Sequence, residues 1–291
     1  MNDINSAYLK KHRDILSFRD LSPHTIDVYT SYLSAFLVWM ETELPEIPVS
    51  DISWEQLRSY FLILKDCRHL NPRTINIHIA QLANFFKYVL HRDWDNREIP
   101  YMKVDEKLPV VPTFGEVNTI IDSFVKIKYK AMIALLYSSG IRVSELCRLH
   151  CGDIHASENY IFISRSKNRS ERRAILSRKA LLILSEYARS DLKGATQTDW
   201  LFPGQKQDTH VCTETVRRIF YDSLVSLGWQ NKGFSLHSLR HAFGLHLYNN
   251  GTDIMSIKEA MGHKSLSSTT VYLTLGIGNG RSVTSPYDCR S

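Results

Sequence analysis

The sequence predicts a mainly α-helical protein of two domains, and three observations support this prediction. Apolar residues recur at helical spacing along most of the chain, and only one short stretch has the character of paired strands. The helical period stops where Pro100, Pro109 and Pro112 punctuate an extended segment. A chain of 291 residues can bury two separate cores. We therefore expect a helical domain at 1–100, a linker at 101–112, a mostly helical second domain with a small β-hairpin at 113–273, and a tail at 274–291.

The first domain is expected to contain three amphipathic helices. Ser22 can cap the first, and Pro23 can take its first position, where the missing N–H costs nothing. Ser53 and Gln56 form a capping box for the second, and Asn71 precedes a proline at the start of the third. The apolar residues of these helices are spaced as buried stripes, so we assign them to the core and give them no chemistry. They are Ile26, Tyr29, Leu33, Phe36, Leu37, Met40, Leu57, Tyr60, Phe61, Leu64, Ile75, Ile79, Leu82, Phe85, Phe86 and Val89.

The second domain is expected to begin at Thr113, whose spacing to Glu116 is that of another capping box. A helix then ends at Gly140, because glycine readily adopts the left-handed conformation of a helix cap. Further helices are expected at 143–149, 180–188, 213–227, 237–248, 253–261 and 268–273.

The exceptions to the helical pattern are a hairpin and a tail. Two short apolar runs, 160–163 and 173–176, flank the polar segment 164–172 and predict two strands joined by a long loop. Residues 274–291 contain three glycines and a proline and have no apolar period, which predicts a flexible tail.

Composition indicates a protein of the cell interior. No apolar run approaches the roughly 18 residues that a membrane span needs, and residues 1–11 lack the apolar core of a signal peptide. The five cysteines are odd in number and scattered, with no C-x-x-C pair, which indicates free thiols rather than disulfides or a zinc site. We therefore expect a cytoplasmic protein with no membrane partner and no cofactor.

The positive charge is unevenly placed along the chain. Residues 1–105 carry 12 Lys and Arg against 14 Asp and Glu, a net −2, whereas residues 106–291 carry 24 against 16, a net +8. A basic half beside a mildly acidic one favours a polyanionic partner held mainly by the second half. Charge alone is weak evidence for nucleic acid, because many basic proteins bind none.

Residues 236–241, LHSLRH, place reactive side chains on one helical face. Positions i, i+3 and i+4 share a face, so His237, Arg240 and His241 should lie together. An isolated pair of this kind is more often a polar helix face with a satisfied histidine. The two histidines also have the spacing of a zinc helix, but the hydrolytic version needs Glu where Ser238 stands.

Other candidate residues have an ordinary structural interpretation when taken singly. Arg142 follows a helix-ending glycine and could be a surface residue that pairs with Glu145. His263 follows another such glycine and could be a cap, and Tyr272 on a short helix could be core. The hairpin loop carries a basic cluster, typical of a solvated or DNA-contacting loop, made of Arg165, Lys167, Arg169, Arg172 and Arg173.

Taken together and in this order, these segments resemble the signature of the tyrosine recombinase (phage-integrase) family. The motifs GIRVSEL, HSLRH and MGHKSLSSTTVY are each fairly specific, and the sequence is similar to the two-domain, Xer-like members over nearly its whole length. SPHTIDVY and NPRTIN resemble the family's SAM-like core-binding domain. The resemblance implies a C-shaped clamp around double-stranded DNA, with a homo-tetramer on paired recombination sites as the working unit.

The resemblance also implies the roles of individual residues. Two arginines clamp the scissile phosphate, two histidines complete the site, and a tyrosine is the nucleophile that forms a 3′-phosphotyrosyl intermediate. A hairpin lysine protonates the 5′-oxygen, and its register is the least certain, with Arg165 and Arg169 as competitors. The implied catalytic residues are Arg142, Lys167, His237, Arg240, His263 and Tyr272.

Elementary chemistry is consistent with these roles. Guanidinium forks bond the non-bridging phosphate oxygens bidentately, which ammonium groups do less well. A tyrosine, with an ordinary pKa of about 10, needs a base or a strong positive field, for which His237 is the candidate base. Lys167 can donate a proton if neighbouring cations lower its pKa. No Mg²⁺ is needed when arginines neutralise the phosphate, and the covalent intermediate makes ATP unnecessary.

Two alternatives use the same pattern. A type IB topoisomerase-like enzyme would relax one duplex with the same residues, and a silent DNA-binding regulator would use none of them. The sequence also departs from the family pattern at its end. Similar members usually carry a helix after the tyrosine that docks into a neighbouring protomer, whereas residues 274–291 have no apolar period.

Overall fold

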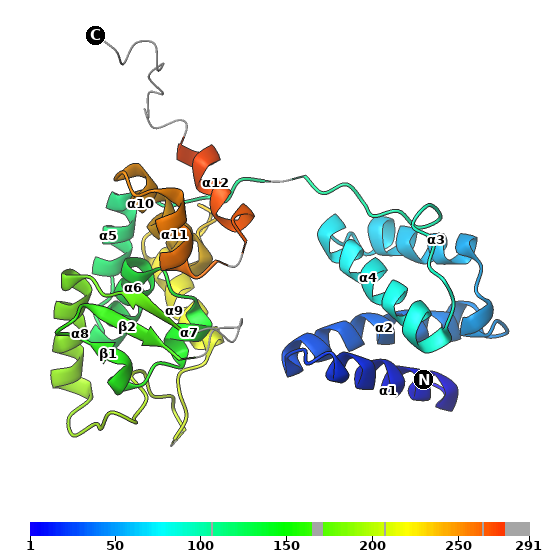
Figure 1. The fold of residues 1–291 in the computed structure, drawn as a ribbon, viewed down its shortest axis with the longest axis horizontal. Coiled ribbons are helices and arrows are strands. Elements are labelled where there is room, and N and C mark those ends of the chain that lie inside the picture. Colours follow the sequence, from blue (N-terminus) through cyan, green and yellow to red (C-terminus); the bar gives the residue numbers. More distant parts are fainter. Residues whose placement is uncertain (106, 165–170, 207, 264, 277–291) are drawn as a thin grey trace, which may run out of the picture. The chain divides into compact units, whose positions relative to one another are not determined.

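A computed structural model describes residues 1–105, 107–164, 171–206, 208–263 and 265–276. The chain divides into two compact units, Met1–Glu106 and Lys107–Ser291 (Figure 1). Helices predominate in both, and the described strands form one small sheet in the second unit. The predicted mainly α fold class is therefore confirmed. No helix within the described ranges combines the length and the apolar character needed to cross a membrane.

The first unit is a bundle of four α-helices with three short helical turns. Its elements are α1 (Asp3–Phe18), α2 (Pro23–Glu43), η1 (Val49–Asp51), α3 (Trp54–Leu62), η2 (Ile63–Cys67), α4 (Pro72–Phe85) and η3 (Phe86–Leu90).

The helix starts predicted for the first unit are confirmed. The Ser22 hydroxyl accepts the Thr25 N–H at 3.2 Å, and Ser53 and Gln56 cap each other reciprocally. The predicted core residues are buried, except that Tyr29 is half-buried. Sequence reasoning did not delineate α1, because its buried face includes the polar residues Asn5 and His12 and so shows little apolar period.

The second unit surrounds a larger core with eight α-helices in the described part of the chain. Its elements are α5 (Phe114–Asp122), α6 (Ile127–Ser139), α7 (Val143–Cys147), η4 (Cys151–Asp153), β1 (Ile154–His155), β2 (Tyr160–Ile163), β3 (Arg172–Ile175), α8 (Arg178–Asp191), α9 (Thr213–Ser226), α10 (Leu236–Asn249), α11 (Ile254–Met261) and α12 (Ser267–Gly276).

The sheet of the second unit is antiparallel in the order β1-β2-β3, and it carries two corrections to the predicted hairpin. The additional strand β1 pairs Ile154 with Ile161, and its two residues are too few to show an alternating pattern. Strand β3 begins one residue earlier than predicted, with Arg172 opposite Ile163. Arg172 therefore belongs to the sheet and not to a solvated loop. Residues 165–170 lie outside the described residues.

The C-terminal boundary also differs from the prediction. Helix α12 continues through Gly276, so the first three residues of the expected tail are helical. The remainder, 277–291, lies outside the described residues.

Candidate active site

The structure joins two glycine-capped helix ends through one buried arginine. Gly140 and Gly262 follow α6 and α11 with φ of 61° and 62°, the left-handed conformation that favours glycine. Arg240 on α10 is 3% exposed. Its guanidinium donates to the Gly140 carbonyl and, at 2.5 Å, to the Met261 carbonyl. The residues after these two glycines, among them Arg142 and His263, are thereby brought to the same end of α10.

A buried carboxylate orients Arg142 at the start of α7. Glu145 has a 3% exposed side chain, and its Oε2 accepts the Arg142 backbone N–H at 2.8 Å. Its Oε1 accepts the Arg142 guanidinium at 2.9 Å. The ion pair expected between Arg142 and Glu145 is present. Because the Glu145 carboxylate is buried, it orients the Arg142 guanidinium, and the pair is not a surface ion pair. The Arg142 side chain remains 26% exposed and can bind a further anion.

The two candidate histidines lie beside these arginines. Burial, then Arg240, then Arg142 lower the pKa of His237, and the same causes in the same order bring that of His263 to about 3. His263 Nδ1 lies 2.9 Å from the Thr269 hydroxyl. Both rings are therefore neutral at pH 7 and able to accept a proton or share a hydrogen bond.

Tyr272 on α12 is packed against α10. It is 0% exposed, and its hydroxyl lies 3.3 Å from His241 Nδ1. A Cβ on Gly244 would lie 2.5 Å from Tyr272 Cζ, so α10 needs glycine where the ring crosses it. Burial raises the pKa of Tyr272 to about 12, although Arg240 acts in the opposite direction. The phenol is therefore protonated at neutral pH.

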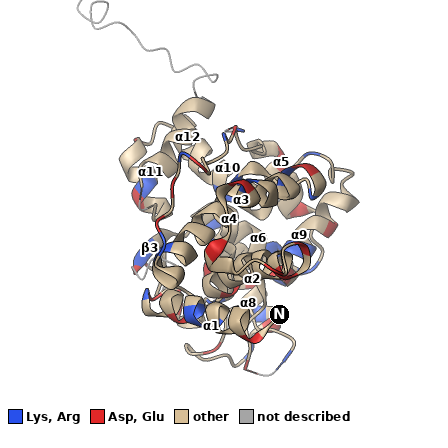
Figure 2. Ribbon diagram, turned by 90° about the vertical axis from the view of Figure 1, so that its right-hand side faces the viewer, with Lys and Arg blue, Asp and Glu red and all other residues tan. Residues whose placement is uncertain are grey.

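A cavity of about 550 Å³ opens where α7, α9 and α10 meet. Arg142, His237 and Arg240 line it, together with Ser144 and Tyr221. The guanidiniums of Arg142 and Arg240 and a neutral imidazole thus face one space, also lined by Arg217, of a size that suits a phosphodiester and its flanking sugars. The basic residues of β3 and α11 visible in Figure 2 belong to the same unit.

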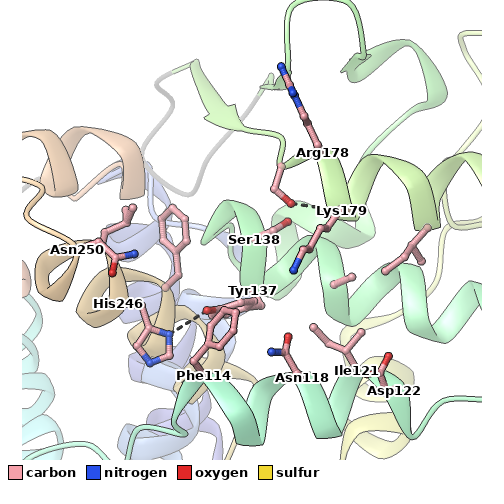
Figure 3. A pocket seen from close by; sticks show the side chains of 16 residues that line it. Phe114, Asn118, Ile121, Asp122, Tyr137, Ser138, Arg178, Lys179, His246 and Asn250 are labelled. Carbon is pink, nitrogen blue, oxygen red and sulfur yellow. Dashed lines mark hydrogen bonds between the residues drawn. The ribbon is translucent and has the colours of Figure 1, made fainter.

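A larger cavity of about 730 Å³ lies between α5, α6, α8 and α10 and contains none of the predicted catalytic residues (Figure 3). The Tyr137 hydroxyl lies 2.9 Å from His246 Nδ1 in this cavity. Phe114 packs edge-on against the same imidazole. The lining of this larger cavity contains one arginine, Arg178, whereas Arg142 and Arg240 both line the smaller cavity, which is therefore the candidate place for the chemistry.

Five of the six predicted catalytic residues lie in the described part of the second unit, around one end of α10. The sixth, Lys167, lies outside the described residues, as do its competitors Arg165 and Arg169. The expected common face of α10 is present, with the His237 and His241 rings 4.6 Å apart. No group of three or more His, Cys, Asp or Glu that could hold a metal occurs in the described ranges.

Sequence reasoning passed over three residues that the structure adds to the site. His241 was placed on the correct face but was given no contact with the tyrosine. Glu145 was considered only as an ion-pair partner, although its spacing of three from Arg142 is that of a capping box. Arg172 was assigned to a solvated cluster, whereas its side chain is 10% exposed.

Comparisons with known proteins identify the family of both units. The model of the phage integrase family matches residues 113–276, and that of the phage integrase N-terminal SAM-like domain matches residues 8–96. The tyrosine recombinase XerD of Oceanobacillus iheyensis is 29% identical over 269 residues, covering 87% of this chain and 88% of that protein.

Solved structures share the fold. The XerH site-specific recombinase bound to a palindromic difH substrate has a TM-score of 0.73 at 20% identity, covering 88% of this chain and 78% of that one. A lambda integrase dimer bound to a COC′ core site has a TM-score of 0.71 at 20% identity, covering 92% and 94%.

Proposed function

The chain belongs to the phage integrase family, and from that premise we propose that it is a site-specific recombinase that cuts and rejoins double-stranded DNA through a 3′-phosphotyrosyl intermediate. The observation that carries the proposal is the meeting of Arg142, Arg240 and His237 at one cavity beside a buried tyrosine. Recombinase is favoured over a topoisomerase-like activity because the relatives are named recombinases and integrases.

In the proposed first step, the Tyr272 oxygen attacks the scissile phosphorus. The new P–O bond to tyrosine forms as the bond to the 5′-oxygen breaks, and charge gathers on the non-bridging oxygens. Arg142 and Arg240 bond those oxygens, and each fixed donor of this kind typically contributes about 10²–10³ in rate. Arg240 is held by two carbonyls and Arg142 by the Glu145 carboxylate, so both guanidiniums are oriented before the phosphate binds, and the partly exposed Arg142 is accessible to it.

Two protons move in this step. The tyrosine proton passes to a neutral imidazole, for which we propose His237, because its lowered pKa keeps it unprotonated before DNA binds. The departing 5′-oxygen takes a proton from Lys167. His263, bonded to Thr269 and next to both arginines, bonds the phosphate or positions Tyr272. Rejoining is the reverse attack by a 5′-hydroxyl, so the bond energy is conserved and no ATP is consumed.

Tyr272 must move to react. It is fully buried and does not line the cavity that Arg142 and Arg240 share. We propose that its hydroxyl leaves His241 and turns toward the phosphate when DNA is bound. This rearrangement breaks the hydrogen bond to His241, a net cost of about 1 kcal/mol, and also displaces the ring from its buried place against Gly244.

The working assembly and location follow from the reaction. Exchange of strands between two sites needs four cleavages, so we propose a tetramer with one protomer per cleaved strand. The DNA substrate lies within the cell, and we propose the cytoplasm as the place of action.

Substitution of the nucleophile tests the proposal. Tyr272→Phe removes one oxygen and should bind a duplex site normally yet leave no covalent adduct. The assay is incubation with a nicked suicide substrate, followed by a denaturing gel in which an adduct migrates slowly. Tyr248→Phe on α10 is the control and should form the adduct. An adduct that survives Tyr272→Phe would refute the assignment and direct attention to Tyr248 and Tyr287.

A further inference from the structure

Arg172 at the start of β3 is less exposed than Arg142 and nearly as buried as Arg240, although its position beside a basic loop suggested a solvated residue. We propose that Arg172 is a positioning residue, which holds Arg142 and the turn before His263 in one arrangement and keeps the charge of Arg142 available to the phosphate. The proposal rests on the proposed recombinase function of the same site.

The first contact of Arg172 is with the carboxylate that orients Arg142. Its Nη2 donates to Glu145 Oε2 at 2.7 Å, while Glu145 Oε1 accepts from Arg142 at 2.9 Å. One carboxylate therefore lies between two guanidiniums, with side chains 3% exposed for Glu145 and 10% for Arg172. Because both carboxylate oxygens are occupied, Glu145 has one orientation, and Arg142 is fixed with it.

The second contact is with the helix end that precedes His263. Arg172 Nη1 donates to the Ala260 carbonyl at 3.3 Å. A Cβ on Gly262 would lie 2.5 Å from Arg172 Nε and 2.6 Å from its Cδ. The Arg172 side chain thus lies directly across Gly262, and a glycine is required there for this reason as well as for its φ of 62°. Arg172 joins α7, β3 and the end of α11.

The same contacts argue against direct binding of the phosphate by Arg172. Both terminal nitrogens bond protein oxygens, and Nε is buried against Gly262. Its effect on the reaction passes through its neighbours.

Charge explains why an arginine is used for this purpose. Glu145 and Arg142 alone would form a neutral pair, and the carboxylate would offset much of the positive field that the phosphate needs. With Arg172 included the group has a net charge of +1, and Arg240 adds a second positive charge close by. Arg172 offsets the charge of Glu145, so that the carboxylate can orient Arg142 without neutralising it.

The test compares Arg172→Met with Arg173→Met in the full-length protein. Arg173 is the next residue of β3, is exposed, and stacks on Tyr160 at 4.5 Å. The measurement is single-turnover cleavage at saturating protein, on a normal site and on one with an uncharged methylphosphonate at the scissile position. On the normal site Arg172→Met should be up to about 10²-fold slower than the wild type, because a displaced clamp loses that much, whereas Arg173→Met should cleave like the wild type.

On the uncharged substrate the deficit of Arg172→Met should largely disappear, because the clamp has no charge to neutralise. In an Arg142→Ala background, Arg172→Met should slow cleavage no further, since the two residues act as a unit. Equal slowing on both substrates, or effects that multiply, would overturn the proposal.

Two further outcomes can be distinguished from those above: failure of the recombinase function itself, and failure of the Arg172→Met variant to fold. If the wild type forms no adduct on either substrate, the recombinase function itself fails. If Arg172→Met does not fold, Arg172→Lys retains the positive charge without the planar pair of donors. Its deficit on the normal site should then vanish in the Arg142→Ala background, and a deficit that persists there would count against the proposal.

Discussion

Both units of the molecule bury histidines whose pKa is lowered chiefly by burial, but the charges that surround these histidines differ. In the first unit, His12 and His78 have pKa values of about 4, caused chiefly by burial with a smaller contribution from one arginine each. His78 packs 4.2 Å from the ring of Tyr32. In the second unit, burial and two arginines act together on His237 and His263.

The buried polar groups of the two units differ in the same way. In the first unit, neither ring nitrogen of His12 has a hydrogen-bond partner in the structure, nor does the hydroxyl of Tyr60. In the second, the buried guanidinium of Arg240 and the carboxylate of Glu145 have hydrogen-bond partners, although Arg172 Nε and the Ser138 hydroxyl have none. The first unit tolerates uncharged polar groups in a core built for packing, whereas the second concentrates partnered charge around an anion site. Neutral histidines are a consequence of burial in the first unit, and in the second we propose that they also take part in the reaction.

The largest expected effect concerns the proton that the neutral histidines cannot supply. If His237 and His263 are unprotonated at pH 7, the 5′-oxygen needs another acid, which we predict to be Lys167. Lys167→Ala should cleave about 10²–10⁴-fold more slowly and should be largely rescued by a substrate with a 5′-bridging sulfur, because a thiolate leaves without protonation.

Arg142→Ala is the control for this experiment and should not be rescued, since charge on the non-bridging oxygens still needs its clamp. Slow cleavage by Lys167→Ala on both substrates would refute the assignment. Rescue of Arg165→Ala or Arg169→Ala instead would move the role to that residue.

The next effect is the acid stability of the first unit. In the folded protein the pKa values of His12 and His78 are lowered from 6.5 to about 4. Below pH 6.5 the unfolded chain therefore binds more protons than the folded one, and the free energy of unfolding decreases as the pH is lowered. At pH 5 each histidine should cost about 2 kcal/mol. The protection factors for hydrogen exchange, which correct for the slower intrinsic exchange at low pH, should therefore decrease in this unit between pH 7 and pH 5, and His78→Phe should reduce the decrease. His24→Phe, an exposed position, should leave it unchanged, and an equal effect of both variants would contradict the explanation.

A smaller effect distinguishes burial from the charge of the arginines as causes of the lowered histidine pKa values. Arg142→Ala should raise the pKa of His237 and His263, because it removes one positive charge that repels their protonated forms, and should leave the pKa of His12 and His78 unchanged. Binding of a duplex site should act in the same direction as the substitution. Histidine resonances followed by NMR titration report all four groups. Equal shifts in both units would show that the arginines do not distinguish them.

The smallest expected effect is that of removing divalent cations. Because guanidiniums neutralise the phosphate, cleavage of the suicide substrate should proceed at the same rate in excess EDTA. Addition of Mg²⁺ to the same reaction is the control. If cleavage is lost in EDTA and restored by a divalent cation, the prediction is wrong, because the arginines of the second unit would then be insufficient to neutralise the phosphate.

The sequence by itself determined the features that depend on neighbours along the chain. Helix starts at Ser22, Ser53 and Thr113 were predicted because a cap and its partner lie within three residues. The apolar stripes of the first unit follow from the helical period, and the order of short motifs was enough to indicate the family. The common face of His237, Arg240 and His241 follows from helical spacing alone.

Only the tertiary structure decided which of several similar residues is buried and what it contacts. Arg172 and Arg173 are adjacent and chemically identical, yet one lies across Gly262 on a buried carboxylate and the other is exposed and stacks on the half-buried ring of Tyr160. His241 meets Tyr272 across 31 residues of sequence, and Arg240 joins Gly140 to Met261. These contacts depend on how α6, α10, α11 and α12 pack, because burial and long-range hydrogen bonds are properties of the assembled core and leave no periodic trace in the chain.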